Sequence, residues 1–64
     1  MPVGTVVQAS ESWILIQSDG GVFYRSSRKD CWFRCEVGDP VAFEISKDPG
    51  TNHAVATEVG MVPR

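Results

Sequence analysis

A chain of 64 residues has room for one small domain, so we expect a single domain over residues 1–64. Its 42% apolar and 22% charged residues are typical of a globular protein and exclude a disordered one. No apolar run approaches the roughly 20 residues that cross a bilayer, and the opening residues lack the features of a secretory signal. The expected location is cytoplasmic, without a membrane partner.

The net charge of −2 argues against binding polyanions by bulk charge. The basic residues are nevertheless clustered, because Arg25, Arg28, Lys29 and Arg34 fall close together and only Asp30 interrupts them. This stretch can be a phosphate-binding segment or a solvated surface loop, and charge alone favours neither.

Turn-forming residues alternate with short segments rich in β-branched and aromatic residues, a spacing typical of an all-β sandwich or barrel. In chain order, strands are expected at residues 3–8, 13–17, 22–26, 41–46 and 54–59. The connection over residues 27–37 is too long for a tight hairpin, and we expect one helical or 3₁₀ turn within it. No long helix is predicted.

Side-chain alternation predicts which faces these strands expose. In residues 13–16, Ile14 and Ile16 face one side, and Trp13 and Leu15 face the other. An unpaired guanidinium is very costly to bury, so Arg25 is expected to face outward.

The same alternation divides the third strand. Phe23 shares the face of Arg25 and is expected to be exposed with it, whereas Tyr24 belongs to the core. Five strands in so short a chain favour a small closed barrel that leaves no open edges. We expect a five-stranded antiparallel OB-type barrel, with an SH3-like barrel as the structural alternative.

Several short motifs follow one another along the chain. Gly4-Thr5-Val6 stands at the start and Val37-Gly38-Asp39-Pro40-Val41-Ala42-Phe43 before the end. Between them lie Trp13-Ile14-Leu15-Ile16 and Val22-Phe23-Tyr24-Arg25. In their order and spacing these motifs resemble those of the cold-shock domain, and the first and last match most closely. The chain resembles a divergent member of that family along its whole length.

The resemblance implies a surface on the second and third strands that stacks on unpaired bases. Trp13 falls on the family's first stacking aromatic, and Leu15 replaces a phenylalanine at the next. Phe23 matches the exposed aromatic of the third strand, and Arg25 stands at a histidine. Trp32 lies where the long loop often carries a stacking phenylalanine.

The chain also departs from the family. Val7, Gln8 and Ala9 occupy positions where the family has an aromatic pair and a lysine. Arg28, Lys29 and Arg34 are candidates to bind phosphates in place of that lysine. The expected function is sequence-tolerant binding of single-stranded RNA or DNA, by a monomer or weak dimer.

The alternative is a protein-interaction module that presents the same apolar residues to a protein partner. No catalytic triad, paired carboxylates or phosphate-binding loop occurs, so we expect neither an enzyme nor a cofactor. Cys31, Cys35 and His53 suit zinc but lack a clear fourth ligand, and reduced free thiols are the favoured interpretation.

Overall fold

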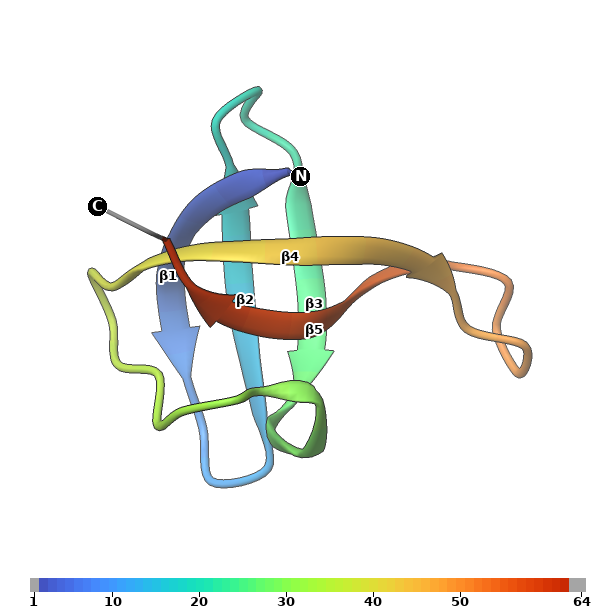
Figure 1. The fold of residues 1–64 in the computed structure, drawn as a ribbon. Coiled ribbons are helices and arrows are strands. Elements are labelled where there is room, and N and C mark those ends of the chain that lie inside the picture. The colour runs from blue at the N-terminus through green and yellow to red at the C-terminus, as the bar shows by residue number, and fades with distance from the viewer. Residues whose placement is uncertain (1, 63–64) are drawn as a thin grey trace.

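A computed structural model describes residues 2–62; Met1, Pro63 and Arg64, which the predicted domain includes, lie outside them. Five strands form a closed barrel in the order β1-β2-β3-β5-β4 (Figure 1). The strands are β1 (Val3–Ala9), β2 (Trp13–Ser18), β3 (Phe23–Ser27), β4 (Pro40–Lys47) and β5 (Ala54–Met61). A 3₁₀ turn, η1 (Arg28–Asp30), follows β3, as expected for the long connection.

The expected all-β, five-stranded OB-type barrel is confirmed, with one refinement in strand direction. Four neighbouring pairs are antiparallel, but β3 and β5 run parallel and are joined through Arg25 and Val55. A closed ring with an odd number of strands cannot alternate in direction all the way round. One parallel pair is therefore required, and here it is the pair that closes the barrel.

The core consists of the inward-facing side chains of the strands and one loop thiol. The buried cluster comprises Val6, Ile14, Ile16, Cys35, Val41, Phe43, Ala56 and Val59. Tyr24 is half-buried against it, with its ring centroid 5.6 Å from that of Phe43. The alternation predicted for the second and third strands is thus confirmed on the core side.

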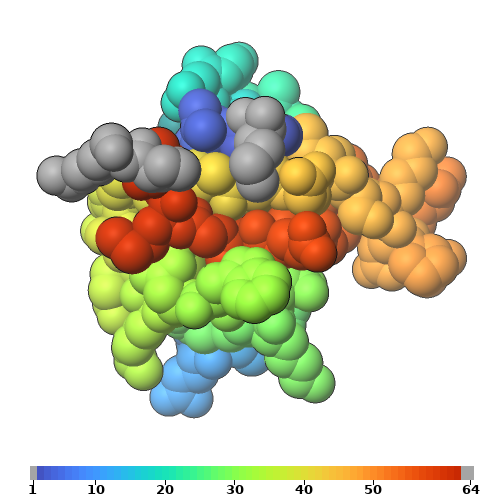
Figure 2. All heavy atoms as spheres, in the orientation of Figure 1, coloured from blue at the N-terminus to red at the C-terminus, as the bar shows by residue number. Residues whose placement is uncertain are grey.

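The connection after β3 covers one end of the barrel. The hydroxyl of Ser27 accepts a hydrogen bond from the backbone N–H of Lys29 and caps η1. Beyond η1, Cys31 forms an isolated parallel bridge with Val59, and the N–H of Trp32 donates to the carbonyl of Val59 at 2.8 Å. This segment, green in Figures 1 and 2, is therefore held against β5, and the β4–β5 hairpin projects away from the body of the barrel.

Gly4 is a position at which β1 pairs closely with both of its neighbouring strands, β2 and β4. It is buried, and it lies opposite Ser18 of β2 and Val41 of β4. A Cβ at this position would collide with the carbonyl oxygen of Gln17 and lie 2.9 Å from the Cα of Ser18. Because both obstacles are backbone atoms, only separation of β1 from β2 would relieve the collision.

Gly4→Ala is expected to destabilise the fold by about 1–3 kcal/mol, as overpacking of a tight interior does. For a domain of this size, each 1 kcal/mol lowers Tm by about 4–8 °C. Gly20→Ala is the matched control, because a Cβ there meets nothing closer than the Ser18 Oγ at 3.9 Å. Thermal unfolding followed by circular dichroism measures both variants, and equal Tm values would contradict the role assigned to Gly4.

Candidate nucleic-acid interface

The outward side chains of β2 and β3 form one continuous surface. Cross-strand pairs join Trp13 to Ser27, Leu15 to Arg25, and Gln17 to Phe23. Opposed residues point to the same side of a sheet. We call these six residues the outer β2–β3 face. On the inward side, Ile14, Ile16 and Ser26 are buried and Tyr24 is half-buried.

Aromatic and cationic groups on this face are open to solvent. Phe23 is 57% exposed and Arg25 is also exposed, whereas Trp13 and Leu15 are half-buried. The orientation inferred from the charge of Arg25 is therefore confirmed. Leu15 lies between the two aromatic positions and lengthens the apolar surface without offering a ring.

Arg25 and Trp13 form a preassembled stack. The guanidinium carbon lies 4.7 Å from the centroid of the indole ring, within the range of a cation–π contact. Arg25 lies opposite Leu15, so Trp13 is its diagonal neighbour across the strand pair. The guanidinium and the indole, two planar groups on which a base can stack, are therefore already in contact without a ligand.

The two rings are too far apart to hold one base between them. Trp13 lies opposite Ser27, which is four residues along β3 from Phe23. At roughly 3.3 Å per strand residue, the two positions are separated by about 13 Å. Each ring is therefore available to a different base of an extended strand.

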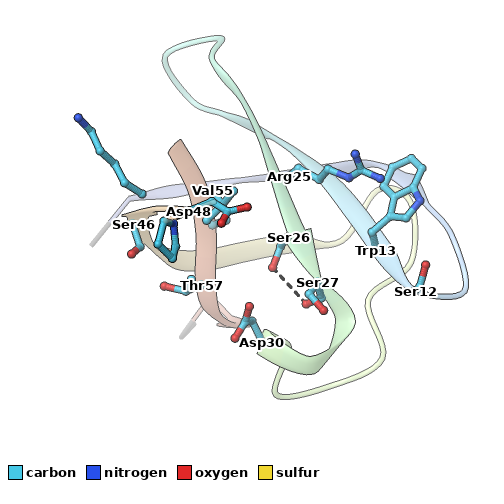
Figure 3. A pocket seen from close by; sticks show the side chains of 13 residues that line it. Ser12, Trp13, Arg25, Ser26, Ser27, Asp30, Ser46, Asp48, Val55 and Thr57 are labelled. Atoms are coloured by element: carbon cyan, nitrogen blue, oxygen red, sulfur yellow. Dashed lines mark hydrogen bonds between the residues drawn. The ribbon is translucent and has the colours of Figure 1, made fainter. Parts of the chain in front are cut away.

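A groove continues from this face toward the β4–β5 loop. It has a volume of about 590 Å³ and opens where β3 and β5 part beyond their single paired position. Trp13 and Arg25 line it on one side, and Asp48 of the loop lines it on another (Figure 3). Pro49 of the same loop is also part of the lining. Its remaining lining residues are Ser12, Ser26, Ser27, Asp30, Ser46, Lys47, Val55, Ala56 and Thr57.

The β4–β5 loop was missed as a candidate from sequence. Its residues Asp48 and Pro49 line the groove with Lys47, the last residue of β4, yet the Lys-Asp-Pro-Gly segment indicated only a turn. The loop follows the exposed end of β4, where four consecutive residues have no buried side chain. In sequence, Ile45 continues the apolar alternation of Val41 and Phe43, yet it is 47% exposed. No local pattern therefore marked the strand that leaves the barrel.

The three loop cations predicted as phosphate contacts have different surroundings. Lys29 is exposed. Arg34 is exposed too, and its Nε lies 3.2 Å from a carboxylate oxygen of Glu36. Arg28 is half-buried; its Nε donates to the carbonyl of Ser10, and its NH1 donates to that of Cys35 at 3.1 Å. Arg28 thus joins the β1–β2 turn to the long loop.

Arg28→Lys keeps the charge but replaces a two-directional donor with a single ammonium that cannot reproduce both contacts. We expect a loss of about 1–3 kcal/mol of stability, which thermal unfolding measures. Arg34→Lys is the control, since that side chain is solvent-exposed and its Tm should be unchanged. An Arg28→Lys protein of wild-type Tm would contradict the structural role.

Trp32 is not brought together with Trp13. It is 78% exposed, and its indole Cδ1 lies within 4 Å of the position that a Cβ on Gly60 of β5 would take. It lines a separate hollow of about 260 Å³ with Lys29, Asp30, Cys31 and Glu58. The aromatic residues named from sequence therefore occupy two places, and Asp30 lines both hollows.

The cysteines are free thiols, and they do not gather with His53. Within residues 2–62, no three His, Cys, Asp or Glu side chains converge in a way that would hold a metal ion. Cys35 is completely buried in the core. Burial, and secondarily the neighbouring Cys31 thiol, raises the pKa of Cys35 to about 12 from an ordinary 9.0.

This pKa predicts loss of stability in alkali. Between pH 9 and 12 the folded chain keeps the Cys35 proton that the unfolded chain releases, so the free energy of unfolding falls as pH rises. The contribution is fully present below about pH 9. Denaturant titrations across this range should give a flatter pH dependence for Cys35→Ala than for wild type. Cys31→Ala should keep most of the slope, because burial is the larger cause, and parallel wild-type and Cys35→Ala curves would refute the assignment.

Comparison with known proteins leaves the family open. The sequence matches no protein-family model, and no curated protein is significantly similar to it. Across residues 2–62, no helix has the length and apolar character needed to span a bilayer.

Proposed function

We propose that the chain binds single-stranded nucleic acid on the outer β2–β3 face. The observation that carries this proposal is the grouping of Trp13, Phe23 and Arg25 on one solvent-facing surface of a small barrel. Aromatic rings stack on any base, and Arg adds a planar cation that can stack or meet a phosphate. The likeness to cold-shock domains points the same way.

The separation of the rings implies two stacking positions along the strand. Each stacked base is worth roughly 1–3 kcal/mol. Because Leu15 lies between the two rings, a nucleotide between the two stacked bases would make only apolar contact with this leucine. Such a site tolerates many sequences and binds with weak to moderate affinity.

Few cationic side chains near this face are available to bind the phosphates of a strand. Arg25 and Lys47 line the groove together with two acids, Asp30 and Asp48. Lys29, which precedes Asp30 in the chain, is exposed. Three phosphate contacts correspond to a slope of about −2 in log affinity against log salt for a single strand. Affinity should then fall roughly fifteenfold between 50 and 200 mM salt.

Changing both Trp13 and Phe23 to Ala should lower affinity for a single-stranded octamer about thirtyfold or more, because neither ring remains to stack on a base. Fluorescence anisotropy of a labelled octamer measures the affinity, and far-ultraviolet circular dichroism verifies the fold. Val37→Ala with Met61→Ala is the matched control, since it removes two exposed apolar side chains that lie outside this face. Unchanged affinity in a folded Trp13→Ala, Phe23→Ala protein would refute the proposal.

The same face is the basis of the alternative function, docking of a protein partner. Phe23 on this face is 57% exposed, and Val22, which precedes β3 and lies outside the face, is 52% exposed. The groove carries as many acids as bases. Repeating the titration at two salt concentrations distinguishes the two functions. Affinity for oligonucleotide that is absent or insensitive to salt would favour protein docking.

A further inference from the structure

Two carboxylates line a groove that, under the proposed function, receives a polyanion. Asp48 uses Oδ1 to accept the N–H of Gly50 at 2.9 Å, which shapes the β4–β5 loop. Asp30 is exposed at the end of η1, and within residues 2–62 its side chain makes no hydrogen bond or ion pair. A carboxylate repels phosphate, so the favourable partners that a bound strand can offer it are N–H groups of bases and, in RNA, ribose 2′-hydroxyls. Of these, only the base N–H groups differ from one nucleotide to another.

Asp30 borders the same groove as the Trp13–Arg25 pair. It follows Ser27 by three residues, and Ser27 is the cross-strand partner of Trp13. Asp30, Trp13 and Arg25 line the same groove, with the carboxylate and the stacked pair at separate parts of its wall (Figure 3). A base on the Trp13–Arg25 stack would turn its edge into this groove.

The floor and walls of the groove are suited to base edges more than to phosphates. Hydroxyls of Ser26, Ser27 and Thr57 line it, and Ser26 is only 3% exposed, with its Oγ donating to the carbonyl of Ser27. The charges of Arg25 and Lys47 are balanced there by Asp30 and Asp48. Such a groove has little net attraction for the backbone, and its selectivity comes from hydrogen-bond matching.

Guanine is the base that matches an ionised carboxylate. Its Watson–Crick edge presents two adjacent donors, the ring imino N–H and the exocyclic amino group, to the two oxygens. Uracil and thymine present one N–H between two carbonyl oxygens, which a carboxylate repels. Adenine and cytosine present an amino group beside an acceptor nitrogen. We propose that Asp30 makes this groove a guanine-selective subsite, an inference that rests on the proposed function.

The test compares three octamers: thymidine throughout, thymidine alternating with guanosine, and the alternating octamer with inosine in place of guanosine. The guanosine octamer should bind at least about fivefold tighter than the thymidine octamer, the lower end of discrimination by a bidentate base contact. Inosine lacks the exocyclic amino group and should lose most of the gain. Quenching of tryptophan fluorescence follows binding.

Asp30→Asn separates base recognition from charge. It should weaken binding of the guanosine octamer and strengthen binding of the thymidine octamer, because an amide pairs with the carbonyls of thymine. Asp19→Asn is the control, with the same charge change in the β2–β3 turn, outside the groove lining. It should leave the preference unchanged.

Three outcomes would overturn the subsite, and they differ from failure of the proposed function. The first is that wild type binds the guanosine and thymidine octamers with equal affinity. The second is that Asp30→Asn raises the affinity for both octamers by the same factor, and the third is that the inosine octamer binds as tightly as the guanosine octamer. Each would refute guanine recognition while leaving strand binding intact. If no octamer bound, the proposed function itself would fail, and the subsite with it.

Discussion

The site depends on how five strands close into a ring. Because five is odd, one neighbouring pair must run parallel, and this chain places that pair between β3 and β5. The pair is joined at a single position, Arg25 with Val55, and the strands part beyond it. The groove opens where they part, so it lies at the seam of the barrel that has the fewest paired positions.

Arg25 connects this seam to the exposed face. Its backbone pairs with both β2 and β5, while its guanidinium lies over Trp13. One residue therefore takes part in closing the barrel and in arranging the aromatic surface. For the proposed function, a face built on paired strands has the advantage that little conformational entropy would be lost on binding, since its backbone is already ordered.

Local patterns predicted the strands well and the loops poorly. Alternation and turn residues located all five strands to within about two residues, and the charge of Arg25 oriented β3 correctly. Arg28 looked like its basic neighbours in sequence, yet it donates to the carbonyl of Ser10, 18 residues before it, and to that of Cys35, 7 residues after it. Contacts of that kind leave no local pattern.

The sequence by itself determined an all-β barrel and the faces that β2 and β3 turn outward, because a period of two and the cost of burying a charge act within a single strand. Only the tertiary structure decided that Trp32 lies against β5, apart from Trp13, and that the β4–β5 loop joins the groove. Those placements depend on which strands become neighbours when the ring closes, a relation between segments distant in the chain.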